Sequence, residues 1–155
     1  WHMKKKFSNA DMYKSIEALG KRKINMLYLL IVGYPTETEK DFNDTLELLR
    51  RSVAYKRYVE VRCNIAMLLP NTEIYDEFYL HHDDDHLWKT QTTDGVLTYK
   101  VRYERWKKVN TLVENLGLKS DKRIKQLEKA ILRNIEKEDS KIILRSLEKE
   151  DSRVI

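Results

Sequence analysis

A glycine and a proline interrupt this chain directly after its most continuous apolar run, at Gly33 and Pro35. The run spans residues 24–32, and the residues after the turn repeat apolar side chains at helical spacing. A strand, a turn and a helix in that order form the step of a parallel α/β sheet at which ligands usually sit. Ligand binding at this turn is therefore the first function that the residues predict.

A second strand, residues 59–69, is predicted to have polar side chains on one face only. Its apolar face would carry Val59, Val61, Cys63, Ile65, Met67 and Leu69, and its other face Glu60, Arg62, Asn64, Ala66 and Leu68. Arg62 and Asn64 would be costly to bury without partners. We expect them either to face a substrate or cofactor, or to lie on the wet face of an edge strand, where charge also prevents aggregation.

Other groups of reactive residues are expected to be structural. The run His81-His82-Asp83-Asp84-Asp85-His86 has metal-binding residue types. Adjacent loop residues rarely converge on one metal ion, so a solvated loop and no metal site are predicted. Cys63 is expected to be a small buried hydrophobic residue. Glu37 and Glu39 are expected to favour the start of the following helix through its dipole.

The composition excludes several classes of protein. A net charge of +5 is spread over interleaved acidic and basic residues, so no basic stripe for nucleic acid is predicted. No apolar run approaches the roughly 20 residues that cross a bilayer, so no membrane partner is expected. The single cysteine excludes a disulfide framework and fits a reducing compartment, for which the cytoplasm is the expected location.

Capping residues and glycines predict where helices begin and end. In chain order these positions are Ser8 or Asn9, Gly20, the capping box Thr36 with Glu39, Gly117 and Ser120. The helix after the turn should run to about residue 54, and another helix should cover residues 99–116. The helix that begins at Ser120 should continue into a charged tail whose sequence partly repeats.

Three segments resemble radical S-adenosylmethionine (SAM) enzymes, in the same order and with similar spacing. The motif of the fifth barrel strand in that family is matched here at Ile31, Gly33, Pro35, Glu37 and Thr38. Residues 2–7 resemble the segment that leaves the fourth strand. Residues 69–75 are similar to the segment after the sixth strand, with Asn71 where the family has glycine. Leu29 and Thr36 depart from the family pattern at two further glycines.

The resemblance implies an α/β fold, namely a fragment of an open β/α barrel with two parallel strands and helices, followed by an α-helical extension. Enzymes of this family cleave SAM at a [4Fe–4S] cluster to start radical chemistry on a substrate. The implied cofactor-binding residues are Ile31, Gly33, Leu68 and Pro70, and the implied substrate-facing residues are Arg62 and Asn64. The substrate, a small molecule, is not identified. The cluster cysteines are not on this chain, so the chain alone is expected to be inactive.

The resemblance also implies an organisation in three parts. Residues 1–80 would be the C-terminal portion of the barrel, residues 81–98 an irregular connection, and residues 99–155 the helical extension. Because the chain starts at Trp1, we expect it to belong to a longer protein. The sequence of residues 33–38 is frequent in the family branch that has a cobalamin-binding domain. Cobalamin is therefore a further expected cofactor of that longer protein. Because the fourth barrel strand is missing, an apolar strand edge is expected to be covered by the helical tail, by self-association or by the absent half of the barrel. The alternative to an enzyme fragment is a truncated, non-catalytic α/β interaction module without cofactor.

Overall fold

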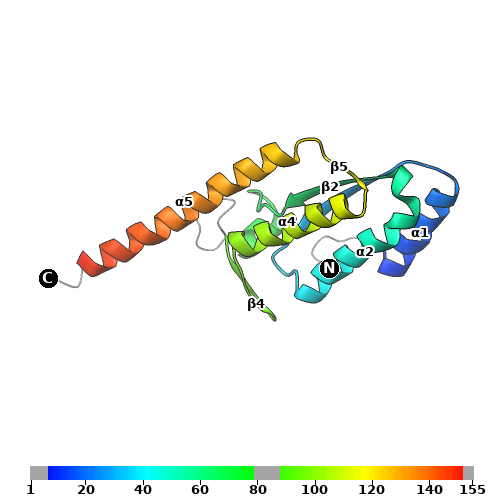
Figure 1. Ribbon diagram of the computed structural model, residues 1–155. Coiled ribbons are helices and arrows are strands. Elements are labelled where there is room, and N and C mark those ends of the chain that lie inside the picture. Colours follow the sequence, from blue (N-terminus) through cyan, green and yellow to red (C-terminus); the bar gives the residue numbers. More distant parts are fainter. Residues whose placement is uncertain (1–6, 79–87, 152–155) are drawn as a thin grey trace.

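The computed structural model describes residues 7–78 and 88–151 (Figure 1). The helices are α1 (Asn9–Lys21), α2 (Glu39–Arg51), α3 (Glu73–Phe78), α4 (Tyr99–Asn115) and α5 (Ile124–Asp151), and a 3-10 helix, η1 (Ser52–Tyr58), follows α2. The strands are β1 (Met26–Val32), β2 (Val59–Ile65), β3 (Thr90–Thr92), β4 (Gly95–Leu97) and β5 (Lys119–Ser120).

A parallel sheet with the strand order β1-β2-β5 forms the centre of this mixed α/β fold. β1 and β2 pair over their whole length, from Met26 beside Val59 to Val32 beside Ile65. This confirms the two predicted parallel strands. β5 was not predicted, and neither was the antiparallel hairpin of β3 and β4, which lies within the segment expected to be irregular.

One face of the sheet carries the main hydrophobic core. α1, α2 and α4 all contribute to it, because each has an apolar stripe at helical spacing. The most deeply buried side chains of this core are Val32, Phe42, Leu46, Leu49, Val59, Val61, Trp106, Val109 and Val113. Trp88, which precedes β3, belongs to a second and smaller hydrophobic cluster with Ala66, Leu68 and Leu97.

The other face of β1 and β2 is not covered within the described part of the chain. Leu29 is 67% exposed, and Leu27 and Ile31 are each 48% exposed. A continuous apolar run such as residues 24–32 is typical of a strand that helices cover on both faces, and this expectation is wrong for β1. We call this surface the open face; its residues are Leu27, Leu29, Ile31, Glu60, Arg62 and Asn64.

The first two helices begin with capping boxes. Ser8 and Asp11 form the box of α1, as expected from the sequence. α2 begins two residues later than predicted, because Thr38 and Asp41 form its box instead of Thr36 and Glu39. Gly20 does not end α1 but lies inside it, where a Cβ atom would come within 2.3 Å of the Tyr55 ring.

The predicted end of α4 is confirmed. Gly117 has φ +66°, and its N–H donates to the carbonyl of Glu114 while the N–H of Leu118 donates to the carbonyl of Val113. These two bonds are those of a Schellman motif, for which glycine is the favoured residue. The chain then enters β5, so Ser120 pairs in the sheet and does not cap α5.

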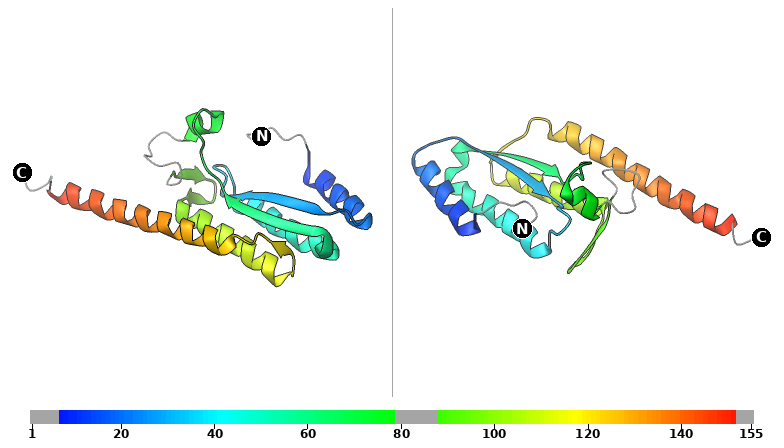
Figure 2. Two further views of the ribbon diagram at one scale, coloured as in Figure 1. Left: turned by 90° about the horizontal axis from the view of Figure 1, so that it is seen from above. Right: turned by 180° about the vertical axis from the view of Figure 1, so that it is seen from behind.

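α5 packs on α4 near its start and then leaves the body of the molecule (Figure 2). Its inward side chains, Ile124, Leu127, Ile131 and Ile135, pack against the main core as their spacing predicts. Since β1 and β5 lie at opposite edges of the sheet, the outer edge of β1 has no strand partner among residues 7–78 and 88–151. No helix in those same residues has the length and apolar content needed to cross a bilayer.

Candidate functional site

The parallel register brings three of the predicted site residues together. Ile31 lies beside Asn64, and Leu29 lies beside Arg62. Side chains of registered residues in parallel strands point to the same face. Asn64 is exposed, and the side chain of Arg62 is 43% exposed with its Nε donating to Glu60 Oε1 at 2.9 Å. The open face thus combines apolar surface with an amide and a guanidinium group.

Leu68 is not part of this face. β2 ends at Ile65, and beyond it Ala66 and Leu68 are buried whereas Met67 and Leu69 are exposed. The predicted alternation through residue 69 is therefore wrong, and the side chain of Leu68 lies in the smaller core cluster, 0% exposed. Pro70 is exposed.

Asn71, directly after Pro70, has a left-handed backbone. Its φ is +65°, a conformation that glycine adopts freely and that asparagine tolerates better than most residues. Asn71 is also the position at which the radical SAM family has glycine. The left-handed backbone at residue 71 therefore favours glycine or asparagine, in agreement with the glycine of the resembling family segment.

Gly33 forms the turn at the end of β1 and is buried. Its φ is +72°, and an added Cβ would lie 2.3 Å from Cγ of Arg102. Its N–H donates to Glu37 Oε2 at 2.7 Å. Both the backbone conformation and the packing of Arg102 therefore require glycine here, and its N–H is already bonded within the protein.

Glu37 and Arg105 form a buried ion pair beneath this turn. Arg105 Nη1 lies 2.7 Å from Glu37 Oε2, and the two side chains are 7% and 8% exposed. The same Nη1 donates to the Glu37 carbonyl at 3.0 Å, and Nη2 donates to Glu39 Oε1 at 2.8 Å. Burial raises the pKa of Glu37, although the N–H of Gly33 and the Arg105 guanidinium both favour its charged form. Glu39 lies in the first turn of α2 as expected, whereas Glu37 precedes the N-cap Thr38, so the expectation that Glu37 favours the helix dipole is wrong.

Arg102, one turn before Arg105 on α4, joins the ends of both long strands. It is fully buried and donates to the carbonyls of Ala66 at 3.2 Å and of Trp88 at 2.8 Å. Its guanidinium lies 3.7 Å from the centroid of the Trp88 ring, within cation–π distance. Because its side chain also covers Gly33, Arg102 ties the end of β1 to the residue that follows β2.

The β3–β4 hairpin holds the same turn from another side. Thr90 Oγ1 donates to the carbonyl of Pro35 at 2.7 Å, and the N–H of Glu39 donates to Asp94 Oδ2 at 2.7 Å. Residues 33–39 are therefore held by α4 and by the hairpin together. This arrangement gives the strand end a defined shape before any ligand arrives.

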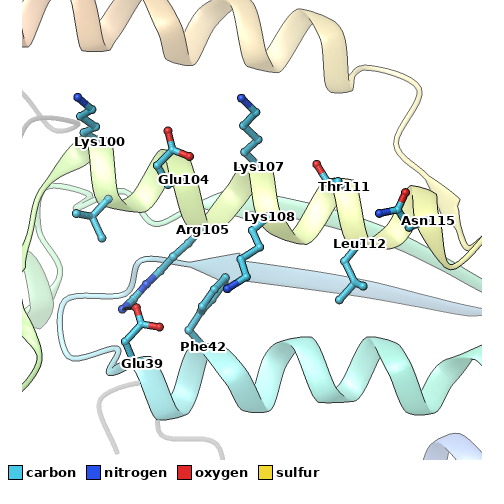
Figure 3. Close-up of a pocket in the computed structure, with 11 residues that line it drawn as sticks. Glu39, Phe42, Lys100, Glu104, Arg105, Lys107, Lys108, Thr111, Leu112 and Asn115 are labelled. Atoms are coloured by element: carbon cyan, nitrogen blue, oxygen red, sulfur yellow. Dashed lines mark hydrogen bonds and ion pairs between the residues drawn. The ribbon is translucent and has the colours of Figure 1, made fainter.

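A groove of about 760 Å³ runs between α2 and α4 (Figure 3). Arg105 crosses it from α4 to Glu39, with Phe42 and Lys108 beside it, whereas Lys100 and Lys107 extend from α4 away from α2. Since Arg105 is bonded to both Glu37 and Glu39, it is not free to bind a ligand here. We therefore regard this groove as the surface above a structural ion pair.

Metal-binding chemistry finds no support in the described residues. No group of three or more His, Cys, Asp or Glu residues there could hold a metal ion. Burial, with a contribution from the Glu37 carboxylate, raises the pKa of the Cys63 thiol to about 12, so it stays protonated. The cluster at residues 81–86 lies outside the described residues.

Arg102 and Arg105 were missed by the sequence reasoning, although a signal for them exists. Both fall on the apolar stripe of α4 that also contains Trp106, Val109 and Val113. An arginine at such a position must be paired or hydrogen-bonded if it is buried. Their partners are 36 and 68 residues away in the chain, so the sequence alone could not identify them.

Comparison with known proteins finds no match for this chain among family models, curated proteins or solved structures.

Proposed function

We propose that the open face is the part of a radical SAM enzyme that receives the nucleoside of SAM and the adjoining substrate. The observation that carries the proposal is the register of β1 and β2, which aligns Ile31 with Asn64 on an uncovered face next to the Gly33 turn. An apolar side chain beside an amide suits a flat base that also needs hydrogen bonds. In the finer form of the proposal, β1 and β2 are neighbouring strands of an open β/α barrel.

Two backbone features support the proposal. Asn71 has φ +65° where the resembling family has glycine, and Gly33 has φ +72° at the family's glycine position. Glu37, at the family's glutamate position, bonds the N–H of Gly33. Gly33, Glu37 and Asn71, three positions within the resembling segments, therefore have conformations or contacts that depend on the residue type.

The residues of the described chain do not fit an iron–sulfur cluster. Such clusters need several thiolates, and the chain has one cysteine, which is buried and protonated at neutral pH. We therefore derive no chemical step through a cluster on this chain. A cluster serving this face would be held by another polypeptide segment.

The open face does fit the nucleoside part of SAM. SAM supplies the group whose cleavage starts radical chemistry in the family. The part of this chain is to bind and orient it: Ile31 and Leu29 offer apolar contact, Asn64 can donate and accept hydrogen bonds, and Arg62 presents charged donors. Gly33 acts by shaping the turn that ends the face.

Equilibrium dialysis of the chain against SAM tests the proposal. We expect measurable binding, and Ile31→Asp should weaken it by about tenfold or more because a carboxylate would be desolvated against the base. Val96→Asp is the matched control, since Val96 is 52% exposed on β4 and should leave binding unchanged. Absence of SAM binding, or an equal loss in both variants, would contradict the proposal.

A non-catalytic interaction module is the second candidate function. It is favoured by the outer edge of β1, which has no strand partner in the described sheet, and by the exposed Leu27 and Leu29. This function predicts that the chain self-associates as its concentration rises and binds no SAM. Leu29→Lys should then abolish self-association in sedimentation experiments, whereas the enzyme proposal does not require association at all.

A further inference from the structure

A second concave surface lies next to the open face, at the edge of the sheet that β5 forms. It has a cavity volume of about 850 Å³, within the range of small-ligand sites. β2, β5 and the turn into α5 supply its walls. Its charged lining residues are Glu60, Arg62, Lys119, Asp121, Lys122 and Arg123.

Basic side chains outnumber acidic ones in this pocket, and both acidic ones are already paired. Glu60 Oε1 lies 2.9 Å from Arg62 Nη2, and Asp121 Oδ2 lies 2.8 Å from Arg123 Nη2. The hydrogen bonds from Arg123 lower the pKa of Asp121 to about 2, so this pair stays charged at neutral pH. Neither carboxylate is therefore available to pair with the other cationic side chains of the pocket.

Lys119 and Lys122 provide the surplus positive charge. Neither forms an ion pair with a carboxylate within residues 7–78 and 88–151, and both are exposed at the mouth of the pocket. The parallel register places Lys119 directly beside Glu60, so its side chain shares the face of Arg62. With the paired Arg62 and Arg123, these two lysines make four cationic side chains from β2, β5 and the following turn that line one concavity.

We propose that this pocket binds a doubly charged oxyanion, of the kind carried by a small phosphate ester. Lysine and arginine donors form charge-assisted hydrogen bonds with such groups, and several donors can share one phosphate. A small molecule is favoured over a nucleic acid because the cations converge on a concave site and form no stripe along the chain. The proposal is independent of SAM binding, although Glu60 and Arg62 border both surfaces.

The test is a titration of the whole chain with inorganic phosphate and pyrophosphate, followed by amide NMR and calorimetry. At about 0.15 M ionic strength, where the Debye length is about 8 Å and charges outside the pocket are largely screened, we expect saturable binding that shifts the amides of residues 60–62 and 119–123. Lys119→Ala combined with Lys122→Ala should weaken binding by roughly tenfold or more. Both lysines are exposed, and thermal unfolding will show that the variant remains folded.

Lys100→Ala combined with Lys107→Ala is the matched control. It removes the same charge from exposed positions of α4 and should leave binding within about twofold of the wild type. Equal weakening in the two double variants would mean attraction to net charge only and would overturn the proposal. So would the absence of saturable binding. Tighter binding of a short single-stranded RNA that pyrophosphate cannot displace would identify a nucleic-acid surface and would also overturn it.

Discussion

At the scale of single residues, Arg105 connects α4 to the turn after β1 through ion pairs with Glu37 and Glu39. It is the buried partner of Glu37, and its loss would leave that carboxylate buried without a counter-charge. We expect Arg105→Ala to lower the free energy of unfolding by about 3 kcal/mol or more, as found when one member of a buried ion pair is removed. Urea unfolding measures the change.

Lys40→Ala is the control for this experiment. Lys40 pairs with Asp44 on the surface of α2 and is 82% exposed, so its removal should produce no measurable loss. Arg105→Lys should recover part of the stability, because it keeps the charge but not the fork of donors. A loss for Arg105→Ala no larger than that for Lys40→Ala would show that the pair is not important to the fold.

Gly33 offers a test in which conformation and packing can be separated. Gly33→Ala would force a non-glycine residue to φ +72° and would place its Cβ 2.3 Å from Arg102 Cγ. Gly117→Ala imposes a similar φ, +66°, but its Cβ would meet only Lys56 Nζ at 3.9 Å. We expect Gly117→Ala to cost about 1 kcal/mol and Gly33→Ala clearly more, both measured by urea unfolding. Equal costs would mean that Arg102 moves aside freely.

Cys63 should be chemically inert while the protein is folded. Burial raises the pKa of its thiol to about 12, so almost no thiolate exists at pH 8. We expect a disulfide reagent to label Cys63 at pH 8 only at the rate of unfolding, and fully in denaturant. Labelling of the folded protein at the rate of free cysteine would contradict the buried position on β2.

At the scale of elements, an aspartate stabilises the start of α1 and another the start of α2, and a third orders the turn that precedes α5. Hydrogen bonds from Ser8 and Thr38 lower the pKa values of Asp11 and Asp41, and Arg123 lowers that of Asp121 to about 2. Because these pKa values lie below those of the unfolded chain, the stabilisation is present above about pH 4 and is lost as the pH falls toward 2.

The free energy of unfolding should therefore fall between about pH 4 and pH 2. Asp121→Asn should reduce the slope of that fall, since it removes a carboxyl group whose pKa is lowered to about 2 in the folded protein. Urea unfolding at a series of pH values measures both slopes. An identical slope in the wild type and in Asp121→Asn would contradict the assigned role of Asp121.

The elements that could be predicted are those with a continuous local signal. The apolar runs of β1 and β2 and the stripe of α4 ending at Gly117 are examples. β5 could not be predicted, because two residues, one of them a lysine, carry no strand pattern, and their pairing depends on β2. The start of α2 was misplaced because two overlapping capping boxes exist, and the choice of Thr38 depends on the bonding of Glu37 to Gly33 and Arg105.

At the scale of the whole molecule, the candidate site was predictable only where strand alternation holds. Ile31, Arg62 and Asn64 share a face because β1 and β2 remain regular to Val32 and Ile65. Leu68 was misplaced because the chain leaves the strand geometry after Ile65, which no residue in the sequence indicates. The arginines of α4 that hold the strand ends could not be assigned partners, since those contacts join residues 36 and 68 positions apart in the chain.

Isoleucine-methyl NMR of the chain titrated with SAM tests most directly whether the open face binds a nucleoside. We expect the Ile31 methyl group to shift and to show nuclear Overhauser contacts to the adenine protons. Ile24 is similarly exposed, at 45%, but precedes β1 and should not respond. An unchanged chemical shift of the Ile31 methyl group at saturating SAM, or an equal shift of Ile24, would mean that the open face does not bind the nucleoside.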